Sequence, residues 1–97
     1  MDNLGRFDEG KSTIRLILNI SYEQGKPIPR LELFNYLALE GVGRTAAYRS
    51  INICKELGLL EDRSYNIDGK RIQSLKLTKK GIDLIEPLKT IEKILNE

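Results

Sequence analysis

The stretch from Gly43 to Leu60 has a regular pattern of apolar and polar positions. Its apolar residues recur at spacings of four, three and three, as they do on one face of a helix. They are Ala47, Ile51, Cys54 and Leu57. Gly58 follows the last of them, where a left-handed helix cap favours a residue without Cβ. The pattern therefore predicts a helix that stops at Gly58 and has one buried face.

The opposite face of this predicted helix carries cationic, hydroxyl and amide side chains. They belong to Arg44, Thr45, Tyr48, Arg49, Asn52 and Lys55. Such groups bind DNA phosphates, and arginine and asparagine also hydrogen-bond to base edges in the major groove. We therefore interpret residues 43–60 as a DNA recognition helix that the rest of the chain holds in place.

Two helices are predicted before it. The first covers residues 12–24, is stopped by Gly25, and buries Ile14, Ile17, Leu18 and Ser21. Pro27-Ile28-Pro29 is expected to be extended and to form a short edge strand. The second helix opens at Pro29 or Arg30, and its buried face is expected to hold Leu31, Leu33, Phe34 and Leu37. A turn from Leu39 to Val42 then completes a helix-turn-helix.

A β-hairpin is predicted after the recognition helix. Asp68-Gly69 lies between the apolar-polar segments 60–65 and 71–77, and this dipeptide favours a tight turn with positive φ. The cations Arg63, Lys70 and Arg71 are expected at its tip. A basic hairpin in this place is typical of a wing that contacts DNA. Protection of an edge strand against aggregation is the alternative role for these charges.

A final helix is expected from Thr78, its cap, to about Asn96. Its apolar stripe consists of Ile85, Leu88, Ile91 and Leu95, widened by Leu84 and Ile94. Pro87 lies inside the pattern and is expected to kink the helix or to start a second one. The stripe could fold back on the first helix or pair with another chain. We expect dimerisation through Leu84, Leu88, Ile91 and Leu95, because leftover apolar surface must be buried.

The distribution of charge supports the DNA-binding interpretation. The 97 residues are enough for one domain with a net charge of +2. Residues 41–80 hold nine Lys/Arg against four Asp/Glu, a balance of +5, while residues 1–40 and 81–97 carry −1 and −2. The basic excess is thus local to the recognition helix and the segment that follows it, as expected of a nucleic-acid footprint.

The composition also excludes several classes of function. With no histidine and one cysteine, the usual zinc sites and Ser-His or Cys-His catalytic pairs are ruled out. The single cysteine allows no internal disulfide and fits a reducing cytoplasm. No apolar run is long enough to cross a membrane, and the polar first ten residues do not form a signal peptide.

One motif points to a different function. Residues 5–12 match the pattern of a phosphate-binding P-loop. No buried strand precedes them, and Asp8 and Glu9 would place negative charge inside the phosphate cradle. We therefore expect no nucleotide cofactor and no enzymatic activity, and we interpret residues 1–10 as a flexible arm.

The order of these elements resembles the winged helix-turn-helix transcription regulators, particularly small archaeal and MarR/PadR-like members. The matching segments are 45–49, 57–60, 68–71 and 77–81. The resemblance implies a mostly helical α+β fold with a three-helix core, a β-hairpin wing and a dimerising C-terminal helix. It assigns Arg44, Thr45, Tyr48, Arg49 and Asn52 to the major groove, and Arg63, Lys70 and Arg71 to the wing.

The expected organisation is an arm at 1–10, a winged-helix domain at 11–80, and a dimerisation helix at 81–97. The expected function is sequence-specific binding of double-stranded DNA by a homodimeric regulator, a repressor that reads a palindromic site. The alternative is a winged-helix module for protein interaction in a larger transcription or replication assembly.

Overall fold

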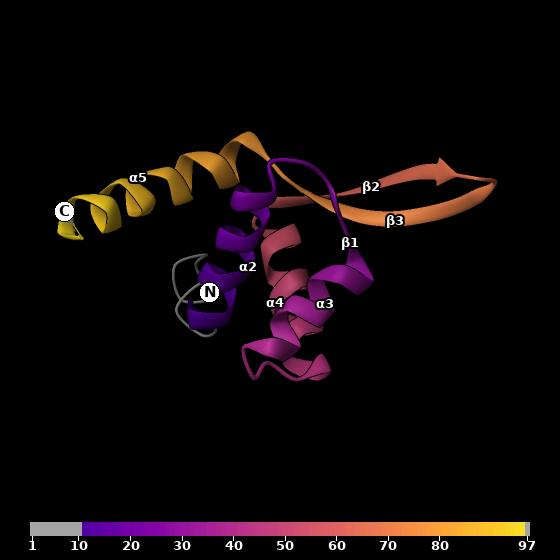
Figure 1. Cartoon of the computed structure of the whole chain (residues 1–97), viewed down its shortest axis with the longest axis horizontal. Coiled ribbons are helices and arrows are strands. Elements are labelled where there is room, and N and C mark those ends of the chain that lie inside the picture. The colour runs from indigo at the N-terminus through magenta and orange to yellow at the C-terminus, as the bar shows by residue number, and fades with distance from the viewer. Residues whose placement is uncertain (1–10, 97) are drawn as a thin grey trace.

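A computed structural model describes residues 11–96 of the chain. The predicted arm at residues 1–10 and most of the P-loop-like stretch lie outside these residues. The elements in order are α2 (Lys11–Gln24), β1 (Ile28–Pro29), α3 (Arg30–Leu39), α4 (Arg44–Glu56), β2 (Leu60–Ile67), β3 (Lys70–Leu77) and α5 (Lys79–Leu95). The predicted mostly helical α+β architecture with a hairpin wing is confirmed (Figure 1).

The central helix of the core is α2, which packs against α3, α4, α5 and β3. Its predicted apolar face is almost completely buried, with Ile14 and Ile17 fully inaccessible. The helix ends where predicted, because Gly25 has a φ of 65° and so turns the chain out of the helix. One helix therefore organises the packing of all the others.

The buried face of α3 differs in one residue from the prediction. Leu33, Phe34 and Leu37 are buried, whereas Leu31 is 61% exposed. At 100° per residue, Leu31 lies well around the helix from the stripe formed by the other three. The expectation that Leu31 belongs to the core was therefore wrong, whereas the other three residues are buried as expected.

The apolar face predicted for α4 is buried along its whole length, with Leu57 at 7% exposure the least covered of the four residues. Gly58 has a φ of 75°, and Lys80 Nζ donates a hydrogen bond of 2.8 Å to the carbonyl oxygen of Leu57 at the helix end. Burial raises the pKa of Cys54 to about 12, so its thiol stays protonated at neutral pH. Cys54 is therefore a small core residue.

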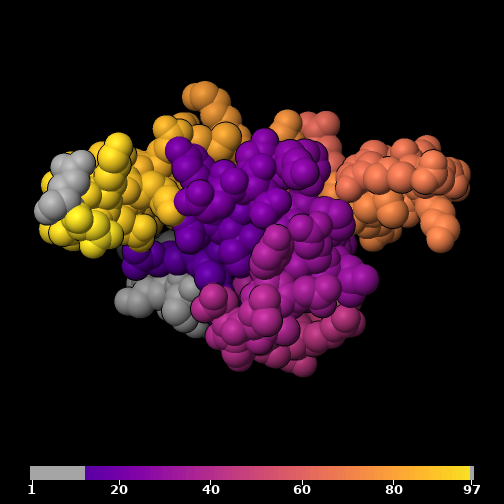
Figure 2. All heavy atoms as spheres, in the orientation of Figure 1, coloured from indigo at the N-terminus to yellow at the C-terminus, as the bar shows by residue number. Residues whose placement is uncertain are grey.

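The sheet is antiparallel with the order β1-β3-β2. The edge strand β1 pairs Ile28 with Leu75, as the extended Pro-Ile-Pro segment predicted. Asp68 and Gly69 form the hairpin turn with φ values of 51° and 79°. Both strands continue closer to this turn than predicted, because Ile67 and Lys70 still pair. The outer part of the hairpin projects from the helical body as a wing (Figure 2).

The start of α5 is fixed at the base of the wing. Thr78 Oγ1 accepts a hydrogen bond of 3.0 Å from the Gly81 amide and donates one of 2.6 Å to the Gly58 carbonyl. A Cβ at Gly81 would collide with the carbonyl oxygen of Leu59, so only glycine fits there. The helix is continuous through Pro87, so the proline does not start a second helix.

The first part of α5 folds back on α2. Ile85 is 3% exposed, and Lys89 Nζ lies 2.7 Å from Asn19 Oδ1 and 2.6 Å from Glu23 Oε1. The hydrogen bond to Glu23 raises the pKa of Lys89 above its ordinary value. Beyond Lys89 the apolar stripe is exposed, and α5 runs away from the body on the side opposite the wing (Figure 1). Within residues 11–96, no helix has the length and apolarity needed to span a membrane.

Candidate nucleic-acid interface

The polar face of α4 is exposed, opposite the apolar stripe that packs on the core. Arg44, Thr45, Arg49 and Asn52 are all exposed on this face. They bring together two guanidinium groups, a hydroxyl and an amide on a single rigid helix. These groups donate hydrogen bonds to phosphates and read guanine and adenine edges.

Aromatic packing from α3 supports this face. The Tyr48 ring lies 4.7 Å from the Phe34 ring between centroids, and it remains 44% exposed. The Arg44 guanidinium lies 5.2 Å from the centre of the Phe34 ring, and the Arg30 guanidinium lies 5.8 Å from that of Tyr48. Cations at such distances from a ring are attracted to its face. The position of Arg44 is thus coupled to the packing of α3 against α4.

Lys55 lies at the end of the polar face and is less accessible than the others. Its side chain is 31% exposed, and Nζ lies 2.6 Å from Asp62 Oδ2. The other oxygen of Asp62 lies 3.7 Å from Arg30 Nη1. Arg30 was not among the predicted site residues, and only its proximity to Tyr48 and Asp62 in the folded chain reveals it. No signal in the sequence connects residues so far apart.

The wing carries its predicted cations at two different places. Lys70 and Arg71 lie at the tip, paired across the strands with Ile67 and Asn66. Arg63 is not at the tip as expected, because β2 continues to Ile67 and places Arg63 opposite Ser74. Its Nε and Nη2 atoms lie 3.1 and 2.8 Å from Glu61 Oε1.

Among the cations of this surface, two groups can be distinguished. We call Arg30, Lys55 and Arg63 the paired cations, because Asp62 and Glu61 at the start of β2 hold them. We call Arg44, Lys70 and Arg71 the open cations, since none of them forms an ion pair with the residues described here. Arg71 only donates a hydrogen bond of 3.3 Å to Ser64 Oγ.

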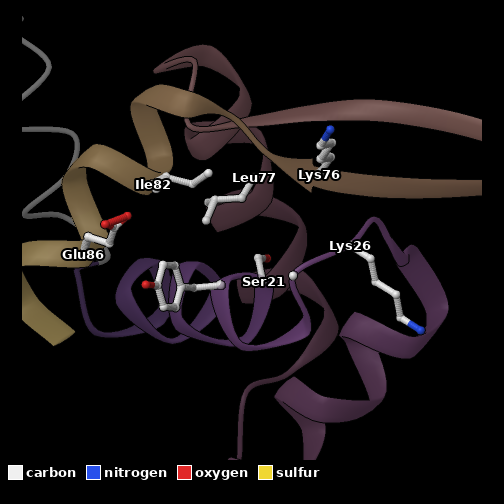
Figure 3. Close-up of a pocket in the computed structure, with 8 residues that line it drawn as sticks. Ser21, Lys26, Lys76, Leu77, Ile82 and Glu86 are labelled. Atoms are coloured by element: carbon white, nitrogen blue, oxygen red, sulfur yellow. The ribbon is translucent and has the colours of Figure 1, made fainter.

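A cavity of about 270 Å³ lies elsewhere, between α2, β3 and α5 (Figure 3). Leu77 and Ile82 form apolar walls, and Lys26 and Lys76 point away from its centre. The Oγ atom of Ser21, one of its lining residues, is buried and has no hydrogen-bond partner among the described residues. Since its lining comes from other elements than α4, this cavity is separate from the polar face.

No protein-family model matches the sequence, and no curated protein matches it. Solved structures do resemble the fold. A PadR-like transcription factor from Bacteroides fragilis ("bacteroid fragilis" in its description) aligns with a TM-score of 0.69 and 20% identity over 98% of this chain and 93% of that one. A PadR family transcription regulator from Clostridium difficile aligns with a TM-score of 0.69 and 22% identity over 87% and 94%.

A third similar structure is a putative transcriptional regulator from Thermoplasma acidophilum. It aligns with a TM-score of 0.62 and 18% identity over 90% of this chain and 88% of that one. At such low identities the likeness concerns the backbone arrangement. This chain therefore has the winged-helix fold found in PadR-like transcription regulators.

Proposed function

We propose that this chain is a cytoplasmic, sequence-specific DNA-binding regulator without enzymatic activity. It acts as a homodimeric repressor, with α4 in the major groove and the wing on the backbone or in the minor groove. The observation that carries the proposal is the exposed polar face of α4, at which Arg44, Thr45 and Asn52 stand away from the core. The open cations of the wing tip supply sequence-independent contacts to phosphate.

The exposed apolar surface of α5 supports the proposed homodimer. The distal part of α5 exposes Ile91, Ile94 and Leu95 at 52, 63 and 76%. A second copy would cover this surface together with Leu84, whereas Leu88 already packs partly against the core. A two-fold dimer would present its two α4 helices to successive major grooves about 10 base pairs apart, on a palindromic site.

Selection of bound duplexes from a random pool tests sequence-specific binding directly. We expect an enriched palindrome, and loss of one α4 contact in Asn52→Ala should cost about 1–3 kcal/mol and relax the preference at one base position. The matched control is Asn96→Ala, which removes the same amide at the far end of α5. Recovery of no common sequence, or unchanged preference in Asn52→Ala, would contradict the assignment of α4.

The wing is tested by salt dependence. Lys70→Ala should weaken binding to all duplexes alike and lower the slope of log Kobs against log salt by about 0.9. Lys79→Ala is the control, because it removes the same charge from a lysine on α5 that is 91% exposed. If the two variants had equal slopes of log Kobs against log salt, the wing tip would not be part of the DNA interface.

One observation favours the alternative of a protein-interaction module. Leu31 and Leu39 on α3 are 61 and 84% exposed, and exposed leucines suit a protein partner. Mixed-sequence duplex at two salt concentrations separates the two functions. A module without its own DNA affinity shows no binding even at low salt, whereas the proposed regulator binds there and weakens as salt rises.

A further inference from the structure

Asp62 occupies an unusual place for a carboxylate, at the junction of the recognition helix and the wing. It is the third residue of β2, and its two oxygens face Lys55 of α4 at 2.6 Å and Arg30 of α3 at 3.7 Å. Neighbouring Glu61 holds Arg63 in the same way at 2.8 Å. Asp62 thus places negative charge within the surface that we propose to bind a polyanion.

We propose that Asp62 competes with DNA phosphate for Lys55 and Arg30, and so lowers the affinity of this surface for duplex DNA of any sequence. The inference rests on the proposed function and adds a residue that regulates the strength of that site. In the free protein the single carboxylate offsets part of the positive charge of the two cations. In the complex, a DNA phosphate takes the place of the carboxylate beside the two cations. Asp62 then faces the negative potential of the DNA backbone.

The exposure of these groups permits such an exchange. The side chain of Asp62 is 56% exposed, against 31% for Lys55 and 24% for Arg30. Ion pairs that water can reach are weak and screened, so a long lysine side chain can change partner at little cost. DNA phosphate is a competitive partner, because its neutralisation releases condensed counterions.

The cost of releasing Asp62 is the same for every sequence, since the exchange concerns the backbone and no base. Base contacts from Arg44 and Asn52 are gained only on a target site. Binding to a non-target duplex therefore includes the cost of releasing Asp62 without the base contacts that offset it. Its complex with the protein dissociates readily. The open cations at the wing tip have no such competitor among the described residues.

The test compares Asp62→Asn with Asp83→Asn, which removes the same charge from α5, where Asp83 pairs with Lys79. We expect Asp62→Asn to bind target and non-target duplexes several-fold more tightly, by the same factor for both. The salt slope should steepen by about 0.9 for each additional phosphate that Lys55 or Arg30 neutralises. Asp62→Glu, which keeps the charge, should behave like the unmodified chain.

A second measurement replaces Lys55, first in the unmodified chain and then in the Asp62→Asn background. Lys55→Met should weaken DNA binding less than Lys70→Met, because Asp62 already offsets the charge of Lys55. In the Asp62→Asn background, Lys55→Met should remove most of the gained affinity, as expected for coupled residues. An equal loss for Lys55→Met and Lys70→Met in the unmodified chain would overturn the competition.

Heparin separates failure of this inference from failure of the proposed function. On a heparin column, Asp62→Asn should elute at higher salt than Asp83→Asn, whether or not the chain binds DNA. Later elution on heparin without any duplex binding would reject the DNA-binding function, and would show that Asp62 competes for Lys55 and Arg30 with a polyanion other than DNA. Duplex binding with identical behaviour of the two asparagine variants would overturn the role of Asp62 and leave the function standing.

Discussion

The helices α4 and α5 both carry an apolar stripe, but only the stripe of α4 is covered along its whole length. On α4 the exposure of the stripe stays at or below 7%, from Ala47 to Leu57. On α5 it rises from 3% at Ile85 to 52% at Ile91 and 76% at Leu95. Two similar patterns therefore have different environments in the folded chain.

The difference follows from what surrounds each helix. The apolar face of α4 packs against α2 and α3, and its end runs into the base of the sheet. The N-terminal part of α5 lies on α2, but its C-terminal part extends past the helical body (Figure 1). Spacing thus identifies residues that share a face, while the neighbouring segments decide whether that face belongs to the core or is left for another chain.

The largest effect should come from the covered stripe of α4. Ile51→Ala removes a fully buried side chain and should lower the free energy of unfolding by about 2–5 kcal/mol, measured by urea denaturation. Leu95→Ala removes a side chain that is exposed in the single chain, and should change the unfolding free energy of the monomer by less than about 0.5 kcal/mol. The Cys54 thiol should react with a thiol reagent only upon unfolding, and therefore faster in Ile51→Ala. Equal losses for both variants would abolish the contrast between the helices.

The exposed stripe of α5 should affect association instead of folding. Ile91→Glu places a charge in the proposed dimer interface and should weaken dimerisation by about 2 kcal/mol or more, measured by sedimentation equilibrium. The melting temperature of the monomer should change little, because Ile91 is half exposed. A monomeric unmodified chain, or a dimer that Ile91→Glu leaves intact, would show that this stripe has no second copy as its partner.

A substitution at the junction between α4 and α5 should have a smaller effect on stability. Thr78→Ala removes the cap of α5 and the hydrogen bond to Gly58 at the end of α4, and should cost about 1 kcal/mol in thermal unfolding. Thr90→Ala is the matched control, since Thr90 donates its hydrogen bond to the Glu86 carbonyl within α5 itself. If the two variants were equally stable, the Thr78 hydroxyl would not connect the helices energetically.

The smallest effect on stability should come from removing the contact between Lys89 of α5 and Glu23 of α2. Glu23 raises the pKa of Lys89 in the folded state, so this contact stabilises the fold below the ordinary pKa of 10.5 and is lost as pH rises through the higher folded value. Lys89→Met should therefore lower the melting temperature slightly at neutral pH and low salt, and not at all above that range. Lys93→Met, which removes a lysine from the last turn of α5, is the matched control.

Local features of the fold could be predicted from the sequence because they depend on neighbouring residues. Gly58, the Asp68-Gly69 turn and the Thr78 cap all lie where their local conformational preferences placed them. The assignment of Leu31 to the core failed, because spacing in a short helix allows two overlapping faces. The predicted position of Arg63 at the tip was wrong as well. The two strands pair closer to the turn than their composition indicated, so Arg63 lies away from the tip.

Part of the candidate site could likewise be predicted from the sequence, and part of it could not. The polar face of α4 could be predicted, because the residues of one helical face follow from helical geometry alone. The contact between Asp62, Lys55 and Arg30 could not be predicted, because it joins three elements that meet only in the folded chain. Its two distances depend on how α3 and β2 are placed against α4.

The sequence by itself thus determined the kinds and order of the elements, the buried and polar faces of α4, and the turn of the wing. Each of these follows from conformational preferences and spacing over a few residues. Only the tertiary structure decided which cations pair with carboxylates. It also decided where along α5 the apolar stripe becomes exposed. Both depend on contacts between distant segments, whose geometry is set by the packing of the whole chain around α2.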